Sequence, residues 1–106
     1  MKNGFMTPPA HINFEAKKLF GAMGEIIDGA IAYMHLNGGG PSEKHTHPHN
    51  HLFIVVKGEA RIELGDETIT VHENESYLVK GTIPHSVWNN AEEETVMIGI
   101  SVKAGI

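Results

Sequence analysis

The chain has 106 residues, of which 41% are apolar, and its formal net charge is -5. This length fits one domain with one core, and Lys and Arg are too few and too scattered for the basic surface that a nucleic-acid partner requires. Cysteine is absent, which excludes disulfides, thiolate metal sites and a cysteine nucleophile. Eight histidines stand out against this background, and four of them fall within residues 45–51.

The sequence shows neither a leader nor a membrane segment. Residues 1–11 include a lysine but no apolar stretch of the kind found in secretory signals. An apolar run such as Leu52–Val56 is too short to span a bilayer. We therefore expect a protein of the cytoplasm that has neither a membrane nor a nucleic acid as its partner.

The N-terminal third of the chain gives mixed signals. Residues 5–14 contain two prolines and several large apolar side chains, which suits an arm that crosses to a second subunit. Within Phe14–Met23 we predict one or two turns of helix, whose length two glycines limit. Gly29–Leu36 follows as a strand that carries His35 on one of its faces.

The rest of the chain has the pattern of short strands separated by turns. Gly38–Pro41 is expected to form a turn, and Leu52–Val56 is rich in β-branched residues, as in a strand covered on both sides. Arg61–Leu64 and Thr68–Val71 alternate polar and apolar residues around a Gly-Asp turn, which predicts a hairpin. Residues 96–102 alternate in the same way. Many short strands at close spacing indicate an all-β sandwich or barrel with little helix.

The histidines predict a metal site. Residues two apart in a strand point to the same side, so His45 and His47 can direct two imidazoles into one cavity, and His51 has the same parity. His85 is remote in sequence and follows a tight approach, Gly81–Pro84, into another strand. Imidazole is a ligand for divalent iron, manganese, nickel, zinc, cobalt and copper, and the residues do not distinguish among these ions. We predict one such ion, held by His45, His47, His51 and His85.

The spacing of these residues resembles that of the cupins, which are small jelly-roll barrels. Their first motif is a glycine, five residues, His-x-His, three or four residues, a glutamate, six residues and a glycine. This chain has the same spacings at Gly39, His45, His47, His51 and Gly58. His51 stands where most cupins have glutamate, and in this the chain is similar to a subgroup of short bacterial cupins that bind the metal with four histidines. The second motif is looser, but its ending fits, with His85 followed after three residues by Asn89.

The resemblance implies a single-domain jelly-roll barrel. Residues 1–30 would form an N-terminal arm and the first strands, and residues 31–106 the core of the barrel, within one domain overall. The resemblance also implies a homodimer, since small cupins often pair by exchanging their N-terminal strands.

Four other histidines are not among the predicted ligands. We expect His49 at the surface or the rim of the site, and His11 and His72 at the surface. His35 is expected to be a hydrogen-bonded core residue, with a role at the pocket as the alternative. The acidic run Glu92–Glu94 is most simply a solvated turn. No residue is assigned a catalytic role.

Three functions are compatible with an ion held by four neutral imidazoles. The leading hypothesis is a metal-dependent enzyme acting on a small organic molecule, foremost an oxygenase, because two remaining coordination positions suit a chelating anion. The resemblance agrees, since many single-domain cupins are dioxygenases. The second hypothesis is an isomerase, epimerase or lyase that uses the ion as a Lewis acid without redox chemistry. The third is a barrel that binds a small ligand without turnover. With His51 in place of glutamate the ligand set lacks a base, so proton transfer would depend on bound hydroxide or on a group outside the ligand set.

Overall fold

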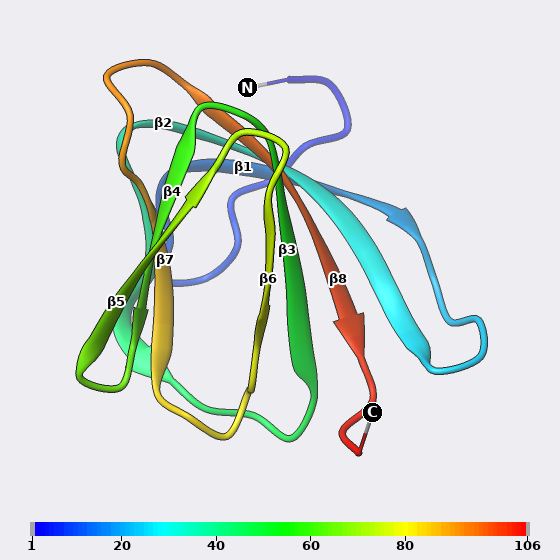
Figure 1. Cartoon of the computed structure of the whole chain (residues 1–106). Helices are drawn as coiled ribbons and strands as arrows, with labels where there is room; N and C mark the ends of the chain where they lie inside the picture. The colour runs from blue at the N-terminus through cyan, green and yellow to red at the C-terminus, as the bar shows by residue number, and fades with distance from the viewer. Residues whose placement is uncertain (1, 106) are drawn as a thin grey trace.

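The computed structural model describes residues 2–105, so Met1 and Ile106, the end residues of the expected ranges 1–30 and 31–106, lie outside the described residues. Residues 2–105 contain eight strands and no helix (Figure 1). The strands are β1 (Ile12–Phe20), β2 (Ile26–His45), β3 (Asn50–Lys57), β4 (Glu59–Leu64), β5 (Glu67–His72), β6 (Ser76–Val79), β7 (His85–Asn89) and β8 (Thr95–Val102). Strand β2 runs across the boundary that the sequence places after residue 30.

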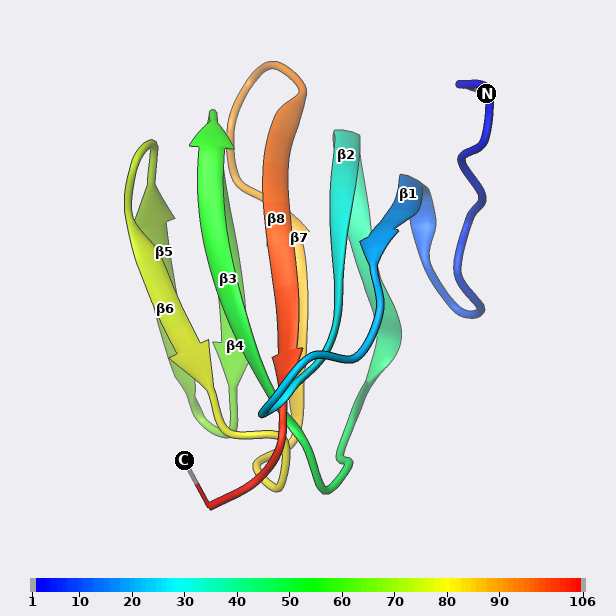
Figure 2. The same ribbon diagram turned by 90° about the vertical axis from the view of Figure 1, so that its right-hand side faces the viewer.

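The strands form one antiparallel sheet that curls into a nearly closed barrel. Hydrogen-bonded neighbours follow the order β5-β4-β7-β2-β8-β3-β6, and β1 pairs with β2. Figure 2 shows two facing layers, with β3 and β8 in the nearer one and β4 and β7 behind them. This is the all-β jelly-roll class that the sequence predicts, in which both layers turn apolar side chains toward a shared interior.

Strand β2 belongs to both layers, which explains its length of 20 residues. Its first half pairs with β8 and its second half pairs with β7. Between the halves, Gly39 and Gly40 have φ values of 152° and 151°. A side chain at Gly39 would overlap the carbonyl oxygen of Val87, so the close approach of the two strands requires glycine. The expected turn at Gly38–Pro41 is therefore a bend within a strand, and it carries His45 into the second layer.

Strand β1 occupies most of Phe14–Met23, for which the sequence predicts helical turns, so that prediction is wrong. The backbone of β1 pairs with β2 from Phe14 to Phe20. Phe14 is buried and lines the interior together with Ala16, whereas Lys17 is exposed. Backbone pairing with the neighbouring strand and burial of alternate side chains outweigh a weak local preference for helix.

The core lies between the two layers. Met34, Val55 and Ile62, from β2, β3 and β4, are fully buried. The hairpin predicted around the Gly-Asp turn is confirmed, since β4 and β5 pair up to Leu64 opposite Glu67. Among residues 2–105 there is no helix of the length and apolar character needed to cross a membrane.

Candidate metal centre

Five histidines converge at one end of the barrel. His45 is the last residue of β2, His51 lies on β3, and His85 is the first residue of β7. His47 and His49 lie in the loop between β2 and β3. The register places His45 directly opposite His85, and this pairing brings the remote histidine to those of the first motif.

Three of the four predicted ligands form one compact group. The Nε2 atoms of His47 and His85 are 3.1 Å apart, and the ring centroid of His45 lies 4.9 Å from that of His47 and 4.6 Å from that of His85. His51 belongs to a second group with His47 and His49, and the ring centroids of His51 and His47 are 4.7 Å apart. Within each group the candidate ligand atoms lie within 4.8 Å of one another. Because His47 is common to both groups, the five rings form one continuous cluster.

Hydrogen bonds at Nδ1 orient three of these rings. The carbonyl oxygen of His49 lies 2.7 Å from Nδ1 of His47, and that of Ile83 lies 2.7 Å from Nδ1 of His85. A carbonyl oxygen only accepts, so Nδ1–H donates in both cases and the Nε2 lone pair is left free. The hydroxyl of Ser101 lies 3.1 Å from Nδ1 of His51. A second hydrogen bond that fixes the tautomer and the ring is typical of histidines that ligate metals.

The electrostatics of the cluster favour the neutral form of four of its rings. Burial first, and then repulsion from the neighbouring His47 and His49, lower the pKa of His51 to about 3. Burial and the proximity of other imidazoles also lower the pKa of His45, of His49 and of His85, although the carbonyl of Ile83 acts in the opposite direction on His85. Neutral imidazole is the form that binds a metal ion, so this cluster is suited to a cation at neutral pH.

The loop that carries His47 and His49 is clamped onto the loop before β7. The amide of Gly81 donates to Oδ1 of Asn50 at 3.0 Å, and the amide of His47 donates to the carbonyl of Gly81 at 2.9 Å. A side chain at Gly81 would overlap the carbonyl oxygen of His49. The absence of a side chain at this position therefore allows the two loops to meet and brings His47 to His85.

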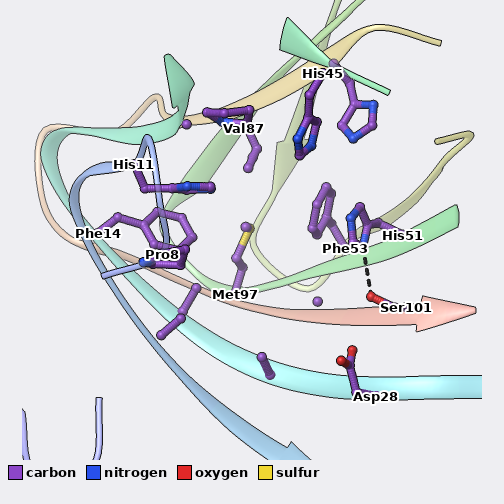
Figure 3. A pocket seen from close by; sticks show the side chains of 17 residues that line it. Pro8, His11, Phe14, Asp28, His45, His51, Phe53, Val87, Met97 and Ser101 are labelled. Atoms are coloured by element: carbon purple, nitrogen blue, oxygen red, sulfur yellow. Dashed lines mark hydrogen bonds between the residues drawn. The ribbon is translucent and has the colours of Figure 1, made fainter. Parts of the chain in front are cut away.

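A cavity of about 240 Å³ opens beneath the histidines (Figure 3). Its lining comes from both layers and from the N-terminal segment, and is formed by Pro8, His11, Phe14, Ala16, Asp28, Ala30, Ala32, Gly40, Pro41, His45, His51, Phe53, His85, Val87, Met97, Gly99 and Ser101. Figure 3 shows His45 and His51 on one side of this space, Phe14 on the opposite side and Met97 between them. A cluster of imidazoles beside an apolar cavity is an arrangement that can hold an ion and a small organic molecule side by side.

Of the four other histidines, His49 and His72 lie where the sequence predicts, whereas the expectations for His11 and His35 are wrong. His49 stacks on His47 with ring centroids 3.9 Å apart, at the rim of the cluster. His72 is exposed, as expected. His11 is half-buried and lines the cavity rather than the outer surface. His35 is outside the cavity and outside the core, where its ring nitrogens lie 2.6 Å from a carboxylate oxygen of Glu15 and 2.9 Å from one of Glu94.

Asp28 is a cavity residue that the sequence did not single out, whereas Asn89 was recognised only as the end of the second motif. Asp28 lines the cavity, and its parity with Ala30 and Ala32 was a signal that could have identified it. Asn89, the last residue of the second motif, is buried and donates to the carbonyls of Met34 and His35 at 3.0 Å each. Its role is therefore to fix the backbone behind the site and not to bind an ion.

Fold and site together define a class, the small single-domain jelly-roll barrel with an imidazole cluster able to hold a metal ion. The sequence model of the cupin domain family matches residues 32–102, which is more than half of the chain. The chain belongs to the cupin family, as its two motifs indicate. No curated protein matches it in sequence.

Solved structures agree on the fold. The cupin domain of Cnp3 from Schizosaccharomyces pombe is similar over 87% of this chain, with a TM-score of 0.76 and 13% identity, and the chain spans 66% of that protein chain. A cupin-2 domain from Rhodospirillum rubrum is similar over 96% of this chain and 72% of its own, with a TM-score of 0.75 and 16% identity. The polyketide cyclase RemF from Streptomyces resistomycificus is similar over 92% and 75%, with a TM-score of 0.72 and 16% identity. At these identities the similarity establishes the fold alone.

Proposed function

We propose that this barrel holds one divalent transition metal ion through His45, His47, His51 and His85, and acts as a metal-dependent enzyme on a small organic molecule. The observation that carries the proposal is that His45, His51 and His85 line an apolar cavity of about 240 Å³, with Nε2 of His47 only 3.1 Å from that of His85. This volume suits a molecule of a few carbon atoms, and the cavity would shield it from water.

Two sets of residues have separate roles, because one would hold the ion and the other would enclose the substrate. The four imidazoles would supply neutral ligands, so a bound ion would keep its positive charge and act as a Lewis acid toward a chelating oxygen group. A redox-active ion would add electron transfer to this chemistry, which is the basis of the oxygenase hypothesis. Phe53, Met97 and Val87 supply apolar walls for the remainder of the molecule.

A non-redox reaction is the second candidate, and Asp28 favours it. A carboxylate on the cavity wall offers a proton acceptor that the ligand set itself lacks. The similarity in fold to a protein described as a polyketide cyclase is compatible with such chemistry by analogy only. An isomerase, epimerase or lyase would use the same ion and the same cavity without consuming oxygen.

Metal content tests the first part of the proposal. Tag-free protein incubated with iron, manganese, nickel, zinc, cobalt or copper and then desalted should retain about one ion per chain by mass spectrometry. His47→Ala and His85→Ala should lose it, because both rings belong to the compact group. The exposed His72 provides the control, since His72→Ala should leave the metal content unchanged. A chain that retains none of these ions would end the proposal.

Oxygen uptake separates the two kinds of chemistry. The iron-loaded protein would be mixed with a series of small diketones and catechols in an oxygen electrode. Consumption of oxygen that disappears in His85→Ala would support an oxygenase. Turnover under nitrogen with the zinc-loaded or nickel-loaded protein would support the non-redox reaction. A rise in melting temperature with each ligand, without product in either atmosphere, would indicate a binding protein and contradict both kinds of enzyme.

A further inference from the structure

The cavity contains a carboxylate that the predicted ligand set does not include. Asp28 is the only acidic residue among the described residues that line the cavity, and it lies on β2 in line with Ala30 and Ala32. No hydrogen bond joins it to another side chain of the cavity wall in Figure 3, where the bond between His51 and Ser101 is drawn. Its carboxyl group is therefore available to a molecule inside the cavity.

The register relates Asp28 to the histidine cluster. Asp28 is paired with Ser101 of β8, and Ser101 is paired with His51 of β3. Residues paired directly across neighbouring strands present their side chains on the same face, so these three polar groups form a row across the cavity wall. Neighbouring strands are about 4.8 Å apart, which places the Cα atoms of Asp28 and His51 about 10 Å from each other. Asp28 and His51 thus line the same cavity from strands that are separated by β8.

A β-bulge adjoins this residue. Ile26 pairs with Val102, whereas Asp28 pairs with Ser101, so Ile27 is an additional residue in β2. A bulge increases the local twist of a strand and redirects the side chains next to it, and bulges are frequent beside active sites. Here it ends the regular pairing of β2 with β8 at the residue that carries the carboxylate.

The predicted ligand set contains no carboxylate that could accept a proton. Four neutral imidazoles contribute no base, and the position that holds glutamate in most cupins is His51. Asp28 supplies a carboxylate at the same level of the barrel from two strands away. Around it the walls are small and apolar, with Ala30 next to it in β2 and Gly99 opposite Ala30.

We propose that Asp28 is the acid–base residue of this site, and that the substrate is a small molecule with a chelating oxygen head at the histidines and a short apolar tail in the cavity. This inference rests on the proposed function. The Asp28 carboxylate takes a proton from the carbon next to the carbonyl of the head. The C–H bond breaks, an O–H bond forms on Asp28, and the electron pair becomes the C=C bond of the enolate. Returning the proton completes an exchange or shifts a double bond, and no oxidant or reductant is consumed.

Hydrogen exchange in heavy water tests the inference with 2-oxobutanoate as the probe. Its carboxylate and carbonyl oxygens form the chelating head, and its C3 hydrogens are those that Asp28 would remove. The zinc-loaded full chain should replace these hydrogens with deuterium. Proton NMR measures the loss of their signal. Asp28→Asn should slow this exchange by about 100-fold or more, the range of a lost general base. Asp28→Glu should restore part of the rate, and Asp66→Asn, at the exposed hairpin turn, should behave like the wild type.

Two measurements that do not depend on turnover distinguish failure of the proposed function from failure of the role assigned to Asp28. Metal content and the rise in melting temperature caused by 2-oxobutanoate should be the same in Asp28→Asn and the wild type. A wild-type chain without metal would refute the proposed function. Metal binding with no thermal effect of the probe would overturn the substrate class. Metal and probe binding with no exchange in the wild type, or with equal exchange in Asp28→Asn, would overturn the role of Asp28.

Discussion

Gly81 is the residue on which the geometry of the histidine loop depends. Its amide and carbonyl both hold that loop, and a side chain there would overlap the carbonyl of His49. We expect Gly81→Ala to weaken metal binding by more than tenfold and to lower the free energy of unfolding by about 1–3 kcal/mol, as overpacking does. Metal titration and urea denaturation measure the two effects. Gly21→Ala is the control, because a side chain at Gly21 meets nothing within 4 Å.

Ala30 sets the space available to the apolar part of a ligand. It faces the cavity next to Asp28 and opposite Gly99. Ala30→Leu adds three carbon atoms to this space, so we expect 2-oxobutanoate to lose its effect on the melting temperature while the metal content stays near one ion per chain. Ala22→Leu, at an exposed position, should change neither quantity. Unaltered probe binding in Ala30→Leu would show that the ligand does not use this part of the cavity.

The residues of the site differ in how well the sequence predicts them. His45, His47 and His51 share a strand-like parity, and the structure brings all three into the cluster. Asp28 was not predicted, because the predicted strand begins at Gly29. The bulge at Ile27 disturbs the alternation that would extend this strand to Asp28. Pairings such as that of Glu15 with His35 depend on the register of two strands, which no local pattern reveals.

At the scale of elements, a cluster of charges joins β1, β2 and the segment before β8. His35 of β2 lies between the carboxylates of Glu15 and Glu94. The backbone amide of Lys2 donates to Glu15 at 2.7 Å, and this bond, followed by that of His35, holds the pKa of Glu15 below its usual value of 4.5. A folded-state pKa below that of the unfolded chain means that ionised Glu15 stabilises the fold above pH 4.5 and that this contribution disappears as the pH falls through the lower folded value.

Glu15→Gln should therefore destabilise the protein at pH 7 and have no effect at a pH below the folded-state pKa. Urea denaturation midpoints of the variant and the wild type, measured from pH 7 down to pH 3, test this. Glu67→Gln alters an exposed carboxylate on β5, far along the sheet order from β1, and it should show no such dependence on pH. A difference between Glu15→Gln and the wild type that persists unchanged at pH 3 would contradict the assignment.

The elements themselves were predictable where their contacts are local. The β4–β5 hairpin closes over a two-residue turn, so its alternation and its turn residues suffice to identify it. Strand β1 was mistaken for helix because its structure depends on β2, whose pairing residues follow only after an intervening turn. The length of β2 was not predictable either, because its two halves pair with β8 and β7, which are both remote in sequence.

At the scale of the whole molecule, the N-terminal segment and β1 leave an apolar border at one side of the barrel. Within residues 2–105, strand β1 has β2 as its only full partner strand, and on its other side only a bridge between Met6 and Ala16 covers it. Met6, Ile12 and Leu19 on this border are 60%, 47% and 50% exposed. An exposed strand edge flanked by apolar side chains is prone to pair with a second chain.

We therefore expect two copies of this chain to associate through β1 and the segment before it, as the resemblance to small cupins implies. Sedimentation velocity at micromolar concentration should give the mass of a dimer for the wild type. The double substitution Met6→Asp and Leu19→Lys should shift it toward the monomer, because each places a charge on the apolar border. Leu78→Lys is the matched control, since Leu78 is 40% exposed but lies on β6, a terminal strand of the sheet order that does not pair with β1. A wild type that sediments as a monomer would refute the dimer, and a dimer that only Leu78→Lys dissociates would move the interface from β1 to β6.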